Sequence, residues 1–571
     1  MRIHSFFTLL FVIVVSCTST KNAGLQDINA YKYTSNKKVI AKNGAVVSAH
    51  PLASKVGVAI MKAGGNAIDG AIATQLALAV VYPNAGNLGG GGFFVARLAN
   101  GQTVALDYRE TAPLTAHRNM YLDESGNVIP NKSLRGHLSS GVPGTVSGLF
   151  ESMKYAKLSV AALIQPAIDL AEKGFAITQR EATSLNRIQE ELIKHNTTTS
   201  AFHKTTPWLT GDTLVQTDLA NTLKRIRDNG AAGFYEGETA RLIVEEMKRG
   251  SGIISNDDLK NYKAKWRTPH TFKYKAYQIV SMPMPSSGGV LLHQMMKMVE
   301  GKPLASYGFL SAQAVQLMVE AERRAFADRS QFMGDADFYK VPVDVITSEG
   351  YLKSRMNDYL PNKAGSSELT KPGRVPIEES KETTHLSVID AEGNAVAVTT
   401  TLNDSYGSKT VVGGAGFFLN DEMDDFSIKP GVPNMYGALG GEANAIVPGK
   451  RMLSSMTPTI VLQNSNPLLV VGTPGGTTIP TSVYQTILNI IEFGLSADDA
   501  VNKPKFHHQW LPDRIDVERS FPQQTRTALE KMGYKLFERG SIGLVELIRV
   551  LPDGRFEAVA DSRGDDGAEG Y

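Results

Sequence analysis

The sequence predicts a mixed α/β fold of the α+β type, in which helices pack against sheets that are built from hairpins. Residues 51–81 form a long helical pattern rich in small side chains, residues 86–111 and 383–402 alternate as β-hairpins do, and residues 467–493 read as a strand, a glycine turn and a helix. With 571 residues, the chain is too long for one ordinary domain. We therefore expect two domains or subunits.

The N-terminus predicts export. An apolar run over residues 6–16 follows Arg2, and it is too short for a membrane-spanning helix, which needs about 20 residues. Residues 1–16 are therefore predicted to be a signal peptide. The sequence Val-Val-Ser-Cys ending at Cys17 resembles a bacterial lipobox, in which the cysteine becomes the lipidated first residue and residues 17–38 form a tether. The alternative is an ordinary cleaved signal beside a cysteine. We expect a periplasmic protein, or one lipid-anchored at the outer membrane of a Gram-negative-type bacterium, with no other attachment to a membrane.

The first half of the chain combines close-packed helices with one strong hairpin. Small residues throughout 51–81 indicate helices packed tightly against a sheet. The hairpin of residues 86–111 turns at Asn100-Gly101 and brings Arg109 to a strand end. A mainly helical stretch follows over residues 160–265, and a further helix is predicted over 312–332.

The second half begins with a segment suited to cleavage. Apolar periodicity is lost between Tyr351 and Lys381, where proline, glycine and polar residues predict an exposed loop. A β-hairpin then begins, with strands over 383–390 and 395–402, so Thr383 lies at the start of a strand. A buried strand over 467–473 leads through Pro-Gly-Gly into a helix.

Composition excludes several classes of function. The 59 basic and 57 acidic residues nearly cancel, so no long-range field attracts nucleic acid, and we expect no nucleic-acid partner. A single cysteine excludes internal disulfides and CxxC metal sites. The pair His507-His508 could suggest a metal, but neighbouring side chains on an extended backbone point apart, which favours structural hydrogen bonds. No metal and no cofactor are predicted.

A threonine at a new N-terminus is one candidate for chemistry. Its hydroxyl is a weak nucleophile until a base removes the proton, and its own α-amine, with a pKa of about 7.7 to 8.0, can be that base. Cleavage between Glu382 and Thr383, where the loop changes to a strand, would create such an end. The residues alone leave open whether the Thr383-Thr384 pair simply begins a strand, as threonine often does.

Nine segments in order and spacing resemble the γ-glutamyltransferase family, over roughly residue 40 to Tyr571. They are AGNLGGGGFFV (85–95), DYRETAP (107–113), SGVPGTVSG (140–148), ADRSQFMGD (327–335), TTHLSVID with GNAVAVTTTLN (383–403), EMDDFSIKPGVPNMYG (422–437), SSMTPTI (454–460), TPGG (473–476) and PKFHHQWLPD (504–513).

The resemblance implies an N-terminal nucleophile hydrolase with a four-layer αββα sandwich. One precursor would cut itself between Glu382 and Thr383 into a large subunit (39–382) and a small subunit (383–571) that stay together as a heterodimer. Thr383 would then attack glutathione or other γ-glutamyl compounds. The resulting glutamyl ester would pass its acyl group to water, or to an acceptor amino acid or peptide.

Site residues follow from the same resemblance. Arg109, Ser454 and Ser455 would hold the α-carboxylate of the glutamyl group, and Asp425, Glu422 and Asn403 its α-ammonium. The backbone amides of Gly475 and Gly476, at a helix entrance, would bind the oxyanion.

Three threonine and tyrosine positions complete the implied site. Thr401 would contact the catalytic threonine and support processing, Thr384 would orient it, and Tyr436 would cover the pocket from a lid loop over 429–437.

Two other functions are considered. Related acylases that act on glutaryl or cephalosporin side chains typically lack the lid and need not bind an α-ammonium, so Asp425 and Glu422 argue against them. A non-catalytic surface lipoprotein is the third reading, and the presence of Thr383, Thr401 and the Gly475-Gly476 pair argues against it.

Overall fold

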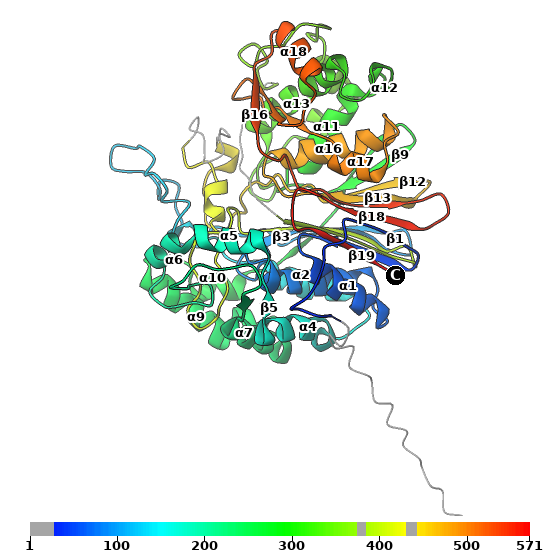
Figure 1. Ribbon diagram of the computed structural model, residues 1–571. Coiled ribbons are helices and arrows are strands. Elements are labelled where there is room, and N and C mark those ends of the chain that lie inside the picture. The colour runs from blue at the N-terminus through cyan, green and yellow to red at the C-terminus, as the bar shows by residue number, and fades with distance from the viewer. Residues whose placement is uncertain (1–27, 374–383, 430–441) are drawn as a thin grey trace, which may run out of the picture.

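Two β-sheets stacked face to face form the centre of the molecule, and a layer of helices covers the outer face of each sheet (Figure 1). The computed structural model describes residues 28–373, 384–429 and 442–571. Cys17, Glu382, Thr383 and Tyr436 lie outside these described residues. The predicted four-layer αββα sandwich is confirmed.

One seven-stranded sheet lies under the upper helices in Figure 1. Its strands, in spatial order, are β1 (Lys38–Ala41), β18 (Phe556–Ala560), β17 (Glu546–Val550), β13 (Asn466–Gly472), β12 (Thr459–Gln463), β9 (Tyr277–Ser281) and β8 (His270–Tyr274).

The second seven-stranded sheet carries the central hairpin of the fold. Its strands, in spatial order, are β19 (Gly567–Gly570), β2 (Gly44–Ser48), β10 (Thr384–Asp390), β11 (Ala395–Thr401), β3 (Gly91–Arg97), β4 (Thr103–Asp107) and β7 (Lys265–Arg267). Strand β10 pairs Thr384 with Thr400, and β11 pairs Thr400 with Gly92. The start of β10 therefore lies at the same end of the sheet as the glycine run Gly89–Gly92. Every residue of β10 and β11 is buried, because this sheet is covered on both faces.

The lower helices pack on the second sheet, and α2 is buried along its whole length. Its alanines and glycine allow it to lie close to β10. The helices of this layer are α1 (Pro51–Lys62), α2 (Ala67–Val81), α3 (Thr145–Ser152), α4 (Val160–Lys173), α5 (Gln179–Arg187), α6 (Gln189–His195), α7 (Thr217–Asn229), α8 (Ala232–Tyr235), α9 (Gly237–Arg249) and α10 (Asn256–Asn261).

The upper helices pack on the first sheet, with α11 against β8 and α16 against β13. They are α11 (Gly288–Val299), α12 (Leu304–Tyr307), α13 (Ala312–Phe332), α14 (Val343–Ile346), α15 (Glu349–Arg355), α16 (Thr478–Ile491), α17 (Ala497–Asn502) and α18 (Gln523–Lys531). Five short strands lie outside the two sheets: β5 (Phe175–Ala176) with β6 (Thr213–Leu214), and β14 (Phe506–His507), β15 (Ile515–Glu518) and β16 (Leu536–Arg539).

Most predicted elements are confirmed, including both hairpins and the helix over 312–332. The predicted loop from Tyr351 is wrong at its start, because residues 351–355 belong to α15. Ser348 caps this helix and Leu352 is buried, and these two features stabilise a short helix whose sequence is otherwise polar. Strand β13, predicted as a buried strand over 467–473, is buried only in its second half. None of the helices among the described residues is long and apolar enough to cross a bilayer.

Candidate active site

The four glycines Gly89–Gly92, of which the last two begin β3, allow several backbones to meet at one end of the second sheet. A Cβ atom on Gly90 would lie 2.0 Å from the carbonyl oxygen of Thr401, and one on Gly91 would lie 2.6 Å from Oε2 of Glu110. Both separations are shorter than a non-bonded contact allows. The absence of side chains in this run therefore brings β3 against the end of β11 and leaves space for an acidic side chain.

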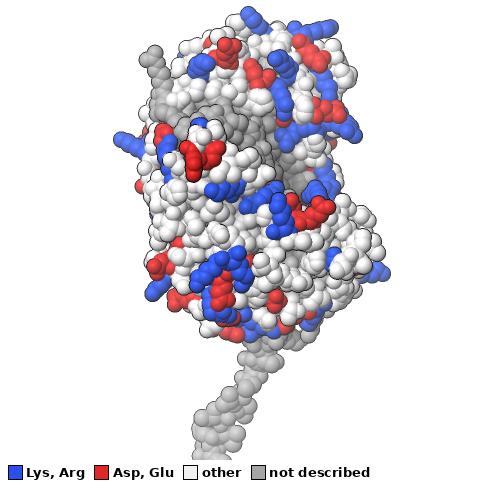
Figure 2. Space-filling model, turned by 90° about the vertical axis from the view of Figure 1, so that its left-hand side faces the viewer, with Lys and Arg blue, Asp and Glu red and all other residues white. Residues whose placement is uncertain are grey.

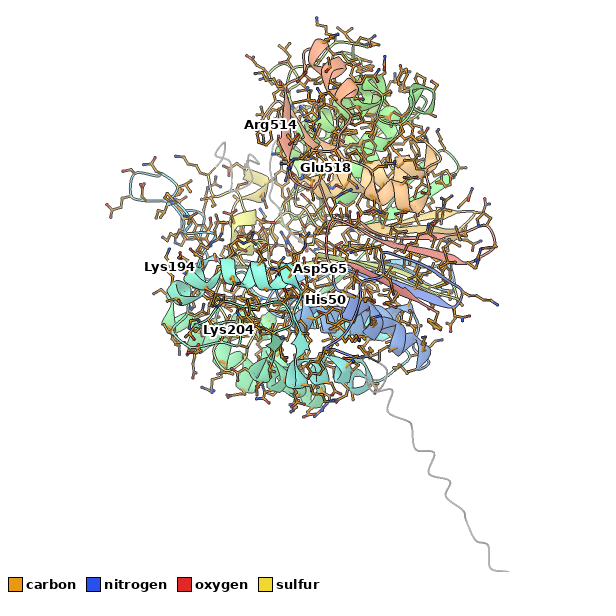
Figure 3. All side chains as sticks on the ribbon, in the orientation of Figure 1. His50, Lys194, Lys204, Arg514, Glu518 and Asp565 are labelled. Carbon is orange, nitrogen blue, oxygen red and sulfur yellow. The ribbon has the colours of Figure 1, made fainter. Side chains whose placement is uncertain are left out.

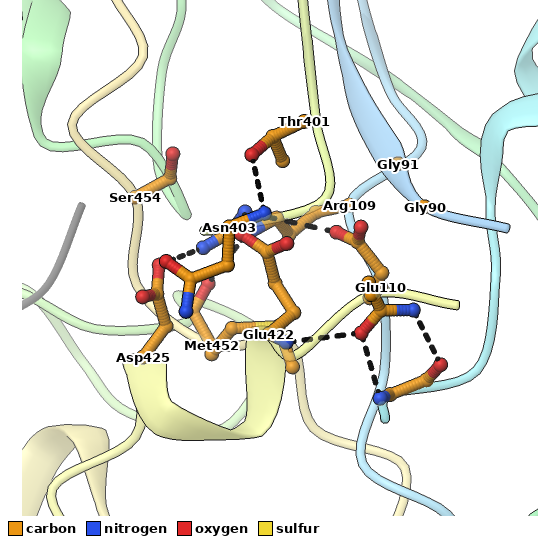
Figure 4. Close-up of polar contacts among 12 residues, drawn as sticks. Gly90, Gly91, Arg109, Glu110, Thr401, Asn403, Glu422, Asp425, Met452 and Ser454 are labelled. Atoms are coloured by element: carbon orange, nitrogen blue, oxygen red, sulfur yellow. Dashed lines mark hydrogen bonds and ion pairs between the residues drawn. The ribbon is translucent and has the colours of Figure 1, made fainter. Parts of the chain in front are cut away.

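Arg109 lies two residues beyond β4, as predicted, and its side chain is only 1% exposed. It forms ion pairs with Glu422 and Asp425, both on a single turn of 3₁₀ helix (Glu422–Asp425), and it lies 3.6 Å from Glu110 (Figure 4). Arg109 also donates to the carbonyl oxygens of Met452, at 3.3 Å, and Leu453, at 3.2 Å. These contacts hold the guanidinium between the two subunits that cleavage would create.

The cluster of charged side chains around Arg109, which we call the Arg109 cluster, contains three carboxyl groups and one guanidinium. Although burial alone lowers the pKa of Arg109, the carboxylates of Glu422, Asp425 and Glu110 raise it above its ordinary value. Burial raises the pKa of Glu110 to about 7, although Arg109 opposes this shift. Burial also raises the pKa of Glu422 well above its ordinary value. When all three acids are ionised the cluster carries an excess of negative charge, which a bound ammonium would reduce.

Asn403 is placed beside this cluster by a strained turn. Its φ is +72°, a conformation that asparagine tolerates better than most residues. Its backbone N–H donates to Oγ1 of Thr401 at 2.8 Å, and its amide nitrogen donates to the carbonyl of Asp421 at 2.9 Å. The amide oxygen is buried and accepts no hydrogen bond among the described residues. Asn403 therefore offers an unused acceptor next to Glu422, as Figure 4 shows.

Ser454 and Ser455 follow directly after the carbonyls that bind Arg109. Arg329 of α13 donates to Oγ of Ser455 and to Oγ of Ser287, both at 2.8 Å. The N–H of Ser287 in turn donates to the carbonyl of Ser454 at 2.7 Å. A buried arginine and the start of α11 therefore fix the position of the serine pair.

Gly475 and Gly476 form the turn before α16, and both have positive φ, at 132° and 64°. The hydroxyl of Thr478 donates to the carbonyl of Gly475 at 2.6 Å, which closes the turn at the helix entrance. At the preceding strand end, a Cβ atom on Gly472 would lie 2.3 Å from the ring of His385. This close packing brings the start of β10, where Thr384 lies, beside the strand that leads into the Gly475-Gly476 turn.

His507 and His508 have protein hydrogen-bond partners. His507 contacts the hydroxyl of Thr481 at 2.9 Å, and His508 accepts from the N–H of Trp510 at 3.0 Å. Burial lowers the pKa of His508 to about 4, so it is neutral near pH 7. The structural interpretation of this pair agrees with these contacts. Among the described residues, no group of three or more metal-ligating side chains gathers in one place.

The structure brings together Arg109, Glu422, Asp425, Asn403 and Thr401, which the sequence places in three separate segments (Figure 4). Ser454 adjoins this group through Leu453, whose carbonyl binds Arg109. Glu110 and Arg329 were not among the predicted site residues. Each lies in a segment that resembles the family, Glu110 in DYRETAP and Arg329 in ADRSQFMGD, and that was the available signal.

Comparisons with known proteins point to one family. A family model described as gamma-glutamyltranspeptidase matches residues 53–571. The glutathione hydrolase proenzyme of Escherichia coli is 47% identical over 537 residues, which cover 93% of each chain.

Two solved structures resemble the fold. The cephalosporin acylase of Bacillus halodurans has a TM-score of 0.82 at 26% identity and covers 96% of this chain and 99% of its own. The gamma-glutamyltranspeptidase of Helicobacter pylori has a TM-score of 0.57 at 45% identity and covers 60% of this chain and 97% of its own.

Proposed function

The chain belongs to the gamma-glutamyltranspeptidase family, and from this premise we propose that it is a self-processing glutathione hydrolase and γ-glutamyltransferase. Its substrates are glutathione and other γ-glutamyl compounds, and the γ-glutamyl group passes to water or to an acceptor amino acid or peptide. Two subunits cut from one precursor form the active heterodimer.

The Arg109 cluster is the observation that carries this proposal. A free glutamyl head carries its α-carboxylate and its α-ammonium on the same carbon atom, so its pocket needs a cation and acids side by side. Arg109 supplies the cation, with Ser454 and Ser455 nearby, and Asp425, Glu422 and the free oxygen of Asn403 supply acceptors. Binding of the zwitterion would exchange internal ion pairs for equivalent pairs with the substrate.

Thr383 is proposed as the nucleophile for both processing and turnover. In processing, its hydroxyl attacks the carbonyl of Glu382, and the N-to-O shift turns the peptide into an ester and frees the α-amine of Thr383. Water then hydrolyses the ester and releases the two chains. In turnover, that amine takes the hydroxyl proton while Oγ attacks the γ-carbonyl of the donor. The bond between the γ-carbonyl and the leaving amine of the donor then breaks, and the leaving amine takes up the proton. Water or an acceptor amine finally cleaves the glutamyl ester.

Neighbouring residues support this assignment. Thr384, directly after Thr383, begins β10, and its hydroxyl is buried without a hydrogen-bond partner among the described residues. The Gly475-Gly476 turn at the entrance of α16 is suited to stabilise the oxyanion, because its backbone can approach closely and the helix start carries partial positive charge. We propose that Thr401 contacts the nucleophile from the end of β11.

The acylase alternative is less consistent with the site. The resemblance to a cephalosporin acylase covers nearly the whole chain. A glutaryl side chain has no α-ammonium, however, and would leave the acids of the Arg109 cluster without a cation to bind. The higher identity to a glutathione hydrolase proenzyme favours the same conclusion.

Tyr436 is proposed as the lid residue over the glutamyl pocket.

For location, we propose that residues 1–16 are removed as a signal peptide and that Cys17 is lipidated. The enzyme would then be periplasmic or anchored at the outer membrane, with residues 17–38 as the tether.

The central test replaces the nucleophile. Thr383→Ala should remain one chain of full length and should not hydrolyse a chromogenic γ-glutamyl anilide, whereas the wild-type protein should yield two chains and be active. Intact-mass measurement of membrane-extracted protein would report both the cleavage before Thr383 and the lipid on Cys17. Activity in Thr383→Ala, or a wild-type protein that is active while uncut, would contradict the proposal.

A further inference from the structure

A cavity of about 660 Å³ lies outside the Arg109 cluster, between α5 and two loops of the C-terminal part. Its lining combines aromatic and aliphatic side chains with polar and charged ones. The lining residues on which the argument depends are Phe175, Arg187, Tyr406, Leu544 and Asp565. Figure 2 views the side of the molecule on which α5 lies and shows it hollowed between the upper and lower halves.

Most charged groups at this cavity are already paired. Asp565 accepts from the hydroxyl of Thr178 at 2.7 Å and lies 3.8 Å from Arg180. Glu181 lies 3.2 Å from the ring of His50. His50 and Asp565 are labelled in Figure 3, close to α5 at the junction of the lower helices and the sheets. These pairs leave little net charge at the N-terminal end of α5.

Arg187, at the C-terminal end of α5, differs from the other charged residues. It is exposed, and its one hydrogen bond to a described residue is a long contact to the hydroxyl of Ser184 at 3.4 Å. No acidic side chain among the described residues lies within ion-pair distance of its guanidinium. The cavity therefore has apolar walls and one uncompensated cation, which is the chemistry that binds a carboxylate on an otherwise uncharged body.

The opposite wall adjoins the proposed reaction centre from two directions. Tyr406 comes three residues after Asn403, and its N–H donates to the carbonyl of Asn84 at 2.8 Å. The N–H of Leu544 donates to Oγ1 of Thr473 at 2.7 Å, at the base of the glycine turn. Gly543 packs directly against that turn, because a Cβ atom on Gly475 would lie 3.5 Å from its Cα atom.

We propose that this cavity binds the amine-side part of the substrate, a short peptide whose terminal carboxylate pairs with Arg187. The same cavity would hold the leaving peptide of a donor such as glutathione and the peptide acceptor that replaces it. A volume of about 660 Å³ suits a di- or tripeptide better than a single small amino acid. The inference rests on the proposed function, because it locates the second reactant of that reaction.

The chemical step is a transfer between two amines. The free amine of the bound peptide attacks the carbonyl carbon of the glutamyl ester on Thr383, so that a C–N bond forms and the ester C–O bond breaks. The proton lost by the amine passes to Oγ of Thr383, through its α-amine, which restores the enzyme. Arg187 takes no part in this exchange and only holds the far end of the peptide.

The experiment compares glycylglycine with glycylglycinamide as acceptors, using a γ-glutamyl anilide as donor. The amide lacks the carboxylate, so the wild-type enzyme should need about tenfold more of it to reach half-maximal transfer, as expected for one charge-assisted pair. Arg187→Gln should lose this preference, mainly through a higher KM for glycylglycine, and Arg187→Lys should retain part of it. All transfer rates are normalised to hydrolysis of the same donor by the same variant.

Arg519→Gln is the control, because Arg519 is an exposed arginine that does not line the cavity and should leave the preference as in the wild type. Equal KM values for the two acceptors in the wild-type enzyme would overturn the proposal without any variant. An unchanged preference in Arg187→Gln would also overturn it. Neither result affects the proposed function, which fails only if the wild-type enzyme does not hydrolyse the donor.

Discussion

Glu110 lies 3.6 Å from Arg109, and both oxygens of its carboxyl group are buried without a hydrogen-bond partner among the described residues. Burial raises its pKa to about 7. In this position the carboxyl group has the guanidinium of Arg109 within reach. A substrate ammonium nearby would favour the ionised form.

The first prediction concerns pH. Glu110 is protonated below about pH 7 and then cannot attract the ammonium, so kcat/KM for a γ-glutamyl donor should fall as the pH drops through 7. The α-amine of Thr383, with an ordinary pKa of about 7.7 to 8.0, must also be deprotonated. The acid limb of log(kcat/KM) should therefore approach a slope of about two in the wild type and about one in Glu110→Gln, as two and one ionisations require.

The free energy of unfolding depends on pH in the opposite direction to kcat/KM. The folded-state pKa of Glu110 is raised above its ordinary value of 4.5, so its contribution to the free energy of unfolding is present below pH 4.5 and is lost as the pH rises through about 7. Glu124→Gln, at an exposed position, is the control for the pH profile. A slope of two that persists in Glu110→Gln would show that Glu110 is not the titrating group.

The second prediction concerns the shape of the cation at position 109. Arg109 contacts two acids and two carbonyl oxygens at once, and the point charge of a lysine cannot reproduce this fork. Arg109→Lys should raise the KM for glutathione by about tenfold or more, with a smaller effect on kcat. Steady-state kinetics with Arg241→Lys as control, where the arginine is exposed, would measure this. An unchanged KM would remove Arg109 from the carboxylate site.

The sequence predicted the parts of the fold that have strong local periodicity. The helix over 312–332 was predicted with both ends correct, because its apolar positions repeat with helical spacing. The hairpin that brings Arg109 to a strand end was also predicted, because an Asn-Gly turn separates two alternating runs. The short helix at residues 349–355 was missed, since one buried leucine in a polar segment gives no periodic signal.

The partners of the site residues could not be derived from local pattern. Arg109 and Glu422 are 313 residues apart, and only the stacking of strands and turns makes them neighbours. Their grouping was predicted from family resemblance. The excess of acid around Arg109 was not, because Glu110 follows it directly and neighbouring side chains on an extended backbone usually point apart. The nucleophilic role of Thr383 stays a prediction.

The third prediction tests the glycine run. A methyl group at Gly90 would lie 2.0 Å from the carbonyl of Thr401 and would push β3 away from β11. Gly90→Ala should lower the free energy of unfolding by about 1 to 3 kcal/mol, as overpacking does, and should slow the split into two chains. Gly350→Ala, in a helix with open space around it, is the matched control and should leave both properties near wild type. Melting curves and the fraction of cut chain measure the two effects, and equal results for both variants would contradict the packing argument.

The fourth prediction assigns a positioning role to Arg329. Its guanidinium holds the hydroxyls of Ser455 and Ser287, and Ser287 in turn fixes the backbone of Ser454. Arg329→Gln should therefore displace the serine pair and raise the KM for γ-glutamyl donors several-fold, whereas kcat should change less, because the contacts of Arg329 to Ser455 and Ser287 position the pocket. Arg329→Lys keeps one donor and should restore part of the affinity. Loss of kcat at unchanged KM would instead place Arg329 in the chemical step, and unchanged kinetics in both variants would show that the serine pair holds its position without it.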